Sequence, residues 1–394
     1  MVRAAVIGVG NMGTAHAACL REGRIAGMTL SAVCDVDPQR LLYFEQRMPE
    51  VARFADWRAL LASGAADAAI VAVPHRLHAQ IGAAALEAGW HTLVEKPIDV
   101  SVSRGRALCD AARRSGRVFA LMLNQRTNPL FRRCREIVRG GQLGELKRSV
   151  WIVTNWYRTQ HYYDSGAWRA TWAGEGGGVL LNQAPHNLDL WQWICGMPAS
   201  LTAYCDTARY HHIEVEDEAT ILTRYANGAS GAFITSTGEY PGTNRLEISG
   251  TLGKIVLEGG KLCWWRLREP EDHVRFASPE SFARIPADYE EILPEGEERA
   301  HAGILQNFAD AILHGAALIS PGEDGLNELT LSNAAYLSQW QGNVRIDLPF
   351  DEAQFDRLLA EHAAASRYAQ DGAQRKAPGG EADGRYSERW RVNW

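Results

Sequence analysis

The sequence has little cysteine, and none of it is paired in a way that binds metal or builds a disulfide framework. The seven cysteines are an odd number, lie scattered from Cys19 to Cys263, and include no C-x-x-C pair. This usage argues against a disulfide-stapled domain and against a zinc site. We therefore expect reduced thiols in a cytoplasmic protein and no metal centre.

An excess of basic charge and a long apolar run are also missing. The formal net charge is −6 and the pI is about 6.1, which argues against a nucleic-acid-binding surface. No apolar run reaches the length of a membrane span, and the N-terminus shows no signal-peptide pattern. We expect a small-molecule partner, with no nucleic acid and no membrane.

The first residues have the pattern of a nucleotide-binding turn. A short apolar strand at 4–7 runs into Gly8-Val9-Gly10-Asn11-Met12-Gly13, and a helix follows to about residue 21. The first glycine permits a tight turn, the second lets the backbone approach a diphosphate, and the third lets helix and strand pack closely. Gly8, Gly10, Asn11, Met12 and Gly13 are therefore predicted to bind a dinucleotide cofactor.

An acidic residue ends the next predicted strand. The strand at 30–34 is followed by Asp35, and no basic residue occurs until Arg40. A carboxylate at this point accepts hydrogen bonds from the adenosine ribose hydroxyls and repels a 2′-phosphate. The sequence thus predicts NAD rather than NADP as the cofactor.

Strands and helices then alternate up to about residue 124. Apolar runs at 68–73, 92–94 and 118–123 are separated by helical patterns at 78–88 and 103–115. Such alternation is typical of a parallel sheet with helices on its faces. We predict a Rossmann domain over residues 1–124.

Lys96 follows the strand that begins at Thr92 and is stopped by Pro97, which lacks an N–H for a sheet. Ligands bind beyond the carboxyl ends of parallel strands, so Lys96 is placed to donate to a substrate hydroxyl. Burial there would lower its pKa. The alternative is a surface ion pair between Glu95 and Lys96.

A loop at 155–178 is unusually rich in large rings. It contains Trp156, Tyr157, Tyr162, Tyr163, Trp168 and Trp172, with Arg158, Asp164 and Arg169 among them. Rings that cover the apolar face of a sugar, beside polar groups that meet its hydroxyls, predict a carbohydrate site. Aromatic and arginine residues are also common at interfaces, so a packed loop or subunit contact is the alternative.

Three glycines at 176–178 precede a second group of polar residues. Asn182, His186 and Asp189 have helical spacing, which predicts that they share one face of a helix unless Pro185 distorts the turn. A histidine suits proton transfer from an alcohol near neutral pH. From the pattern alone, a core or capping histidine is the alternative.

The remaining sequence predicts an α+β domain with a large, mainly antiparallel sheet over residues 125–350. Short β runs at 219–223, 229–235, 245–249 and 254–257 are joined by turns such as Ala226-Asn227-Gly228. One face of this sheet should need cover from another subunit, so a homodimer or homotetramer is expected. Residues 351–394 are predicted to form a C-terminal helix and tail.

Three motifs together resemble the Gfo/Idh/MocA oxidoreductases. They are Gly8-x-Gly10-x-x-Gly13-x-x-His16, Val73-Pro74-x-x-x-His78 and Ala88-Gly89-x-His91-x-x-x-Glu95-Lys96-Pro97, and the segment from Gly176 to Asp189 resembles the second signature of that family. The resemblance implies a catalytic Lys96 before a cis peptide bond and an acid/base His186. It places Val73, Pro74, His78, Glu95, Lys96 and Gln125 near the cofactor.

One position departs from the family pattern, in which many members have an aspartate where this chain has Asn182. An amide orients a hydroxyl but carries no charge, which weakens any transfer of inositol specificity. The expected function is NAD-dependent oxidation of a secondary hydroxyl of a sugar, glycoside or cyclitol. Lys96, Asn182 and His186 are predicted to be catalytic, and Trp156, Tyr157, Arg158, Tyr163, Trp168 and Arg169 to contact substrate with them.

Two other functions fit the same motifs. A glycosidase would oxidise the sugar transiently, eliminate the aglycone and reduce the ring again without net NAD turnover. A non-catalytic NAD-binding sensor would keep the fold with a degenerate site, although the presence of both Lys96 and His186 argues against it.

Overall fold

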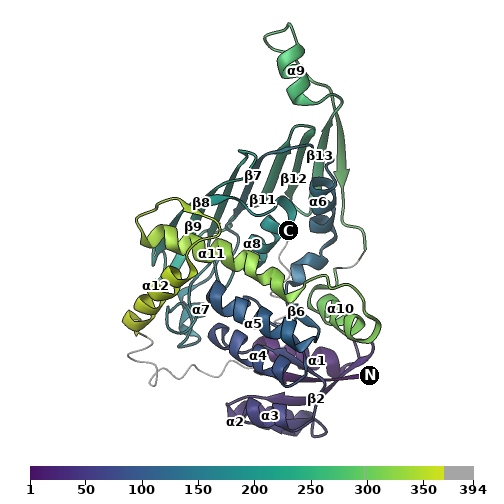
Figure 1. Cartoon of the computed structure of the whole chain (residues 1–394), viewed down its shortest axis with the longest axis vertical. Helices are drawn as coiled ribbons and strands as arrows, with labels where there is room; N and C mark the ends of the chain where they lie inside the picture. Colours follow the sequence, from purple (N-terminus) through teal and green to yellow (C-terminus); the bar gives the residue numbers. More distant parts are fainter. Residues whose placement is uncertain (297, 368–394) are drawn as a thin grey trace.

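The computed structural model describes residues 1–296 and 298–367, and these form two sheets with helices packed against them (Figure 1). The first sheet has six parallel strands in the order β3-β2-β1-β4-β5-β6, which is the strand order of a Rossmann fold. Its strands are β1 (Val2–Ile7), β2 (Met28–Cys34), β3 (Ala52–Phe54), β4 (Ala68–Val71), β5 (His91–Val94) and β6 (Phe119–Leu121). The predicted parallel sheet is confirmed.

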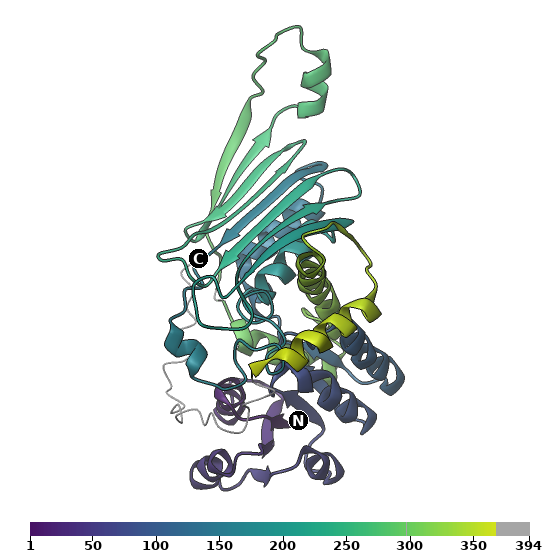
Figure 2. The ribbon, with the colours of Figure 1, turned by 90° about the vertical axis from the view of Figure 1, so that its left-hand side faces the viewer.

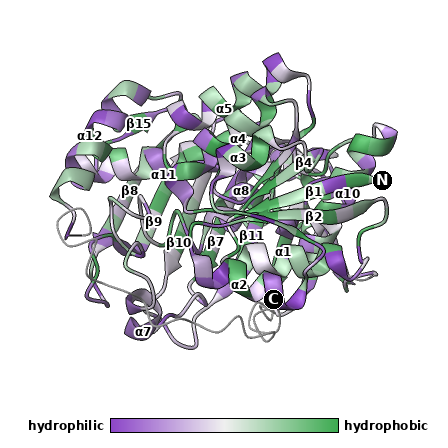
Figure 3. Cartoon of the chain, turned by 90° about the horizontal axis from the view of Figure 1, so that it is seen from below, coloured by the Kyte–Doolittle hydropathy of each residue, from purple (hydrophilic) through white to green (hydrophobic). Residues whose placement is uncertain are grey.

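Five helices connect these strands: α1 (Asn11–Arg21), α2 (Pro38–Arg47), α3 (Trp57–Ala62), α4 (His78–Glu87) and α5 (Val102–Ser115). Aspartates fix two of their starts, because Asp37 accepts from the backbone N–H of Gln39 and Asp56 from that of Arg58. Figure 3 shows the strands of this sheet as mainly hydrophobic, whereas the surrounding helices carry both hydrophobic and hydrophilic residues. The apolar helix faces therefore pack on the sheet.

The second sheet has nine strands in the order β14-β13-β12-β11-β7-β10-β9-β8-β15. Neighbours are antiparallel except β7 and β10, which run parallel. The strands are β7 (Leu146–Val153), β8 (Ser200–Thr207), β9 (Glu216–Arg224), β10 (Ser230–Ser236), β11 (Asn244–Gly250), β12 (Gly253–Glu258), β13 (Lys261–Leu267), β14 (Ala287–Ile292) and β15 (Ile346–Asp347). The predicted β9–β10 hairpin forms, and Gly228 supplies its positive φ of 85°.

One face of this sheet is covered by helices (Figure 2). These helices are α6 (Pro129–Arg139), α8 (Pro185–Cys195) and α11 (Gly325–Trp340), with α12 (Glu352–Ala365) packed beside α11. Alternate strand residues point inward, so Trp151 of β7 and Phe233 of β10 lie on the covered face. There they form one aromatic cluster with Trp191 of α8. On the outward face, Val150, Ile152, Ala232 and Ile234 remain partly exposed.

Helix α10 (Ala300–His314) returns from the second sheet to the first. Ile304, Leu305 and Phe308 are fully buried in the same apolar cluster as residues of β1 and β2. The apolar stripe of this helix does not by itself identify the surface that the helix covers.

A projecting arm follows β13, in the region 267–300 that the sequence did not explain. It carries α9 (Glu271–Ala277) at its tip and returns as the edge strand β14 (Figure 1). Phe276 and Phe282 on this arm are 83% and 93% exposed.

All seven cysteines are free, as predicted. Among the described residues, no helix is both long and apolar enough to cross a membrane. The aromatic residues of the predicted tail, Tyr386, Trp390 and Trp394, lie outside the described residues.

Candidate active site

The glycine turn between β1 and α1 is packed too closely for side chains. Gly8 has φ +85°, and a Cβ there would lie 2.6 Å from the carbonyl oxygen of Ala72. A Cβ at Gly13 would lie 1.8 Å from the carbonyl oxygen of Gly8. Asn11 and Met12 begin α1, whose first N–H groups therefore open onto this turn. This geometry fits a bound diphosphate.

Asp35 lies at the end of β2 beside the same turn. One of its oxygens accepts from the backbone N–H of Val9 at 2.8 Å, and the other accepts from that of Asp37 at 2.9 Å. Arg40 is 3.8 Å from the Asp35 carboxylate, and its guanidinium also lies 2.8 Å from where a Cβ of Gly10 would be. The carboxylate thus holds a cation across the glycine turn.

From this position Asp35 is expected to set the preference for NAD over NADP. Asp35→Ala removes an acceptor for the ribose hydroxyls and a repulsion toward a 2′-phosphate, and it releases Arg40. We expect the NAD/NADP affinity ratio to narrow by about tenfold, one charged hydrogen bond being worth about 1.5–3 kcal/mol. Dissociation constants measured for both cofactors test this, with Asp56→Ala as a matched helix-cap control. Equal or tighter NADP binding by the unaltered protein would contradict it.

Lys96 leaves the end of β5 and reaches the second half of the chain. The Lys96–Pro97 peptide bond is cis, as predicted. The ammonium donates to the carbonyl oxygen of Asn182 at 2.7 Å. Burial lowers the pKa of Lys96, while the carboxylates of Glu95, Glu328 and Glu175 oppose that shift. The predicted direction of the shift is confirmed.

Glu95 does not form the surface ion pair considered above. It is 7% exposed, and its carboxylate lies 2.7 Å from the Nε2 atom of His16 on α1. Burial opposes the charge on Glu95, but the bond to His16 and the nearby His301 and Lys96 lower its pKa to about 2. Glu95 therefore stays ionised and is held beside α1 through His16, and its predicted place near the cofactor stays a prediction.

His78 joins the two loops that flank the site. Its Nδ1 atom lies 2.7 Å from the carbonyl oxygen of Pro97, and its Nε2 atom lies 2.7 Å from that of Val73. Both ring nitrogens are thus used within the protein. His78 thus ties the Val73–Pro74 segment to the turn that carries Lys96, and its predicted place near the cofactor stays a prediction.

The prediction that Asn182, His186 and Asp189 share one helical face is wrong. Helix α8 begins at Pro185, because a proline suits the first helical position, and Asn182 lies in the turn before it. Asp189 instead pairs with the buried Arg126 at 2.6 Å. The amide of Asn182 turns toward Glu175 and the hydroxyl of Tyr162.

His186 stands in the first turn of α8 with its Nδ1 atom buried. Among the described residues, that atom has no hydrogen-bond partner. Burial first, then the charges of Lys96 and His301, lower the pKa of His186 well below its ordinary value. The imidazole is therefore neutral at neutral pH and free to accept a proton.

Three other buried side-chain oxygens, in the segments that follow β6 and precede α8, also lack partners within the part of the chain that the structure describes. They are Asn124 Oδ1, Gln125 Oε1 and Gln183 Oε1. Buried polar groups are normally hydrogen-bonded, so unpaired ones gathered at one site fit a ligand that carries donors. Gln125 was predicted at the cofactor, and its carbonyl oxygen suits a carboxamide N–H.

The aromatic loop separates into buried and accessible rings. Trp156 donates from its indole to Asn187, and the Tyr163 hydroxyl shares a hydrogen bond with Thr237, so both rings pack inside the protein. Tyr157 is 44% exposed. The partly exposed Trp168 meets the edge of His75, whose own pKa is lowered by burial, His78 and Lys96. Trp156 and Tyr163 are thus held by contacts within the protein, and their predicted contact with substrate stays a prediction.

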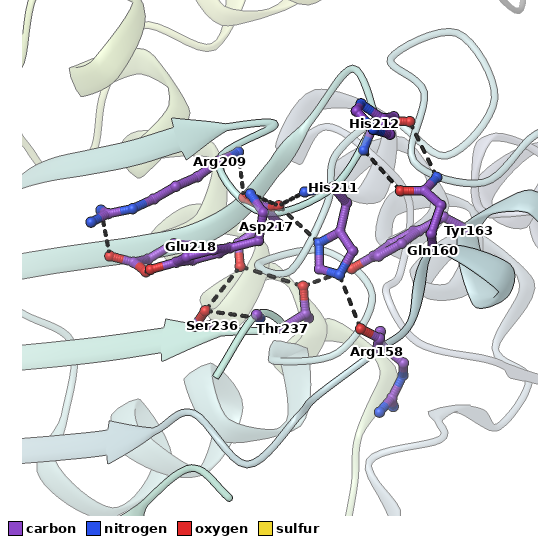
Figure 4. Close-up of polar contacts among 12 residues, drawn as sticks. Arg158, Gln160, Tyr163, Arg209, His211, His212, Asp217, Glu218, Ser236 and Thr237 are labelled. Carbon is purple, nitrogen blue, oxygen red and sulfur yellow. Dashed lines mark hydrogen bonds and ion pairs between the residues drawn. The ribbon is translucent and has the colours of Figure 1, made fainter. Parts of the chain in front are cut away.

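A polar network anchors this loop to β9 and β10 (Figure 4). The Asp217 carboxylate accepts from the backbone N–H groups of Arg209, Tyr210 and His211. The His211 ring lies 2.9 Å from Asp217 on one side and 2.9 Å from the carbonyl oxygen of Arg158 on the other. Arg158 is thereby held by its backbone, and its guanidinium lies 5.1 Å from the centre of the Tyr162 ring.

Arg169 lies closer to Lys96 than the sequence indicated. It donates to the Tyr162 hydroxyl at 2.9 Å, and its guanidinium lies over the Trp168 ring. The same hydroxyl accepts from Gln183 at 3.2 Å. Tyr162 therefore links the aromatic loop to the turn before α8.

Three ionisable residues at the site were missed. Glu175 contacts Asn182, His301 lies beside His16 with ring centres 5.8 Å apart, and Glu328 is fully buried with both oxygens unpaired among the described residues. Glu175 directly precedes the glycine triplet, which was a usable signal. The other two come from α10 and α11, where nothing in the sequence marks them.

Family models match both halves of the chain. Residues 2–123 match an oxidoreductase family with an NAD-binding Rossmann fold, and residues 131–256 match the Gfo/Idh/MocA C-terminal domain. The first match ends before, and the second begins after, the domain boundary expected near residue 124.

Characterised relatives extend the comparison along the chain. Inositol 2-dehydrogenase of Rhizobium meliloti is 25% identical over 348 residues, covering 86% of this chain and 96% of that protein. D-glucoside 3-dehydrogenase of Escherichia coli is 30% identical over 203 residues, covering 50% of this chain and 55% of that one. The WlbA dehydrogenase of Bordetella pertussis, solved with NADH and UDP-GlcNAcA, superposes with a TM-score of 0.74 at 26% identity, covering 89% of this chain and 99% of that one. The chain thus belongs to the Gfo/Idh/MocA family of NAD-binding oxidoreductases.

Proposed function

We propose that this protein is an NAD-dependent dehydrogenase that oxidises a secondary hydroxyl of a sugar, glycoside or cyclitol. The observation that carries the proposal is the meeting of Lys96 and the turn before His186, joined by the hydrogen bond from Lys96 to Asn182. Relatives named as dehydrogenases of inositol and glucosides support the substrate class.

His186 is the proposed base. Its lowered pKa keeps the ring neutral, and its Nδ1 atom is buried without a partner among the described residues. It would accept the proton of the substrate hydroxyl as the carbinol carbon is oxidised.

Lys96 is proposed to act on the same oxygen. Its ammonium donates a hydrogen bond and stabilises the negative charge that builds up as the proton leaves. Asn182 holds that ammonium through its backbone carbonyl, which makes it a positioning residue. Bound NAD supplies the hydride acceptor, and the protein contributes position and electrostatics.

We further propose that Tyr157, Arg158, Trp168 and Arg169 contact the substrate, together with Lys96 and Asn182. Trp168→Ala should raise the substrate KM about threefold to tenfold and leave the NAD dissociation constant unchanged, because the ring would lose its contact with the sugar face. Trp264→Ala, at a buried tryptophan of β13 outside the aromatic loop, is the matched control: it empties a buried site and should lower the free energy of unfolding by about 3–5 kcal/mol without raising the KM. Unaltered substrate kinetics in Trp168→Ala would assign the loop to structure or to an interface.

A homodimer or homotetramer is proposed as well. The outward face of the second sheet carries the partly exposed Val150, Ile152, Ala232 and Ile234 in its central strands. An apolar strip of this kind is typical of an interface. Light scattering at micromolar concentration measures the mass, and a monomer would reject the assembly.

The function itself is tested by incubating the protein with NAD and a panel of sugars, glycosides and cyclitols. NADH absorbance and product formation are followed together. NADH formed in step with a keto product supports the dehydrogenase. Aglycone release without NADH would instead identify a glycosidase, and bound NAD without any reaction would identify a sensor.

A further inference from the structure

A carboxylate outside the expected catalytic set lies at the centre of this site. Glu175 is 2% exposed, in the turn between the aromatic loop and α8. One of its oxygens accepts from the side-chain amide of Asn182, and the other accepts from the backbone N–H of Ala170 at 2.5 Å. Both partners are donors, so both favour the ionised carboxylate.

Asn182 connects this carboxylate to Lys96. The side-chain amide of Asn182 donates to Glu175, while the backbone carbonyl oxygen of Asn182 accepts from the Lys96 ammonium at 2.7 Å. The backbone of Glu175 is tied to the same surroundings, because its carbonyl oxygen lies 3.3 Å from the Nδ1 atom of His75. One short path of contacts therefore runs from Glu175 through Asn182 to Lys96.

Two other carboxyl groups lie near Lys96, and neither can take this role. Glu95 is committed to His16. Burial and the charge of Asp189 raise the pKa of Glu328 well above its ordinary value, which favours its neutral form. Burial also raises the pKa of Glu175, but the Arg169 charge, the two donors and Lys96 oppose that shift. Glu95 and Glu175 both offset the burial of Lys96, and Glu175 is the one that hydrogen bonds join to Lys96 through Asn182.

We propose that Glu175 is a positioning residue for the oxidation: it orients Asn182 and supplies the negative charge that keeps the Lys96 ammonium protonated. Asn182 transmits the orientation but carries no charge itself. The role in catalysis rests on the proposed function, whereas the pairing of Glu175 with Lys96 does not.

The pairing can be measured without a substrate. The chain contains five lysines, so protein labelled at the lysine side chains gives few NMR signals, and Lys96 is assigned by its loss in Lys96→Ala. Glu175→Gln keeps the size of the side chain and removes its charge. The titration midpoint of Lys96 should fall by about one pH unit, as expected when an opposite charge is removed at this range.

Two further variants make the test specific. Glu175→Gln combined with Asn182→Asp moves the negative charge from position 175 to its hydrogen-bond partner at position 182. This double variant should restore the titration midpoint of Lys96. Glu291→Gln removes the carboxylate beside the surface Lys261 and should leave Lys96 unchanged. The double variant also covers the case in which Glu175→Gln alone folds poorly, which a thermal melt would reveal.

Removing the Glu175 charge should also change the pH dependence of the reaction. In Glu175→Gln, the alkaline limb of kcat/KM should move to lower pH with the Lys96 midpoint, while the NAD dissociation constant stays constant. An unchanged Lys96 midpoint in folded Glu175→Gln, or a double variant that fails to restore it, would overturn the pairing. If the midpoint shifts but the unaltered protein oxidises nothing in the panel, the pairing stands and the proposed function, with its catalytic use of Glu175, is rejected.

Discussion

Replacing Lys96 by alanine is expected to abolish most turnover while leaving NAD binding largely intact. In the proposed mechanism the Lys96 ammonium donates to the substrate oxygen and stabilises the negative charge that develops on it. Removing one such donor costs about 10²–10³-fold in kcat, and the loss here should be at least as large as that in His186→Ala because the charge is lost too. Steady-state kinetics with the best substrate of the panel, together with NAD titration, measures both effects.

A surface lysine serves as a matched control, because its removal shows whether loss of any lysine would have the same effect as loss of Lys96. Lys261 forms a surface ion pair with Glu291 at 2.6 Å, and Lys261→Ala should change neither turnover nor NAD affinity. If Lys96→Ala retained near-normal turnover, the ammonium would have no part in the reaction and the mechanism would be wrong.

His186→Ala is expected to lower turnover by about 10²–10⁴-fold, the usual contribution of a general base. Because the pKa of His186 lies well below its ordinary value, the base is already deprotonated at neutral pH. The acid limb of the pH profile of the unaltered protein, which this base sets, should therefore lie well below the ordinary histidine value of about 6.5.

The alkaline side of the profile belongs to Lys96. Burial lowers its pKa below the ordinary lysine value, so its proton is lost as pH rises through that lowered value and activity should fall there. The two limbs together give a bell-shaped kcat/KM profile. His186→Ala should remove the acid limb, whereas His273→Ala, at an exposed position on the arm, should preserve it. An acid limb that survived in His186→Ala would assign it to another group.

The effect of Asn182→Asp has to be reconsidered in light of Glu175. If the new charge lay beside His186, it would favour the imidazolium form and move the pH profile upward. In the structure the side chain at 182 faces the Glu175 carboxylate. Two carboxylates in contact cannot both ionise easily, so one proton should be shared between them and the single variant should be less active than the double one.

The first half of the site was predictable because its signals are local. The glycine turn, Asp35 and the proline after Lys96 each follow a strand within a few residues, and backbone sterics alone fix their geometry. The same holds for the strand order, which follows from the alternation of strands and helices. Lys96 was found because the end of a parallel strand is a defined place in the fold.

The second half was harder, because its geometry depends on contacts that are distant in sequence. Helical spacing placed Asn182 on α8, but the proline at 185 starts the helix after it. Ring composition could not separate the buried Trp156 from the partly exposed Trp168, since both occur in the same loop. His301 reaches the site only because α10 folds back on the first sheet, 177 residues after Asn124, which it approaches.

The return of α10 to the first sheet also affects the order in which the two halves fold during synthesis. Ile304, Leu305 and Phe308 complete the apolar layer that contains Val6 and Leu30. Burying each of these three side chains is worth about 1.5–3 kcal/mol, so a nascent chain that has only reached residue 124 lacks a considerable share of the cohesion of its own first sheet. During synthesis, the nucleotide-binding half therefore cannot complete its apolar core until α10, which ends at His314, has left the ribosome.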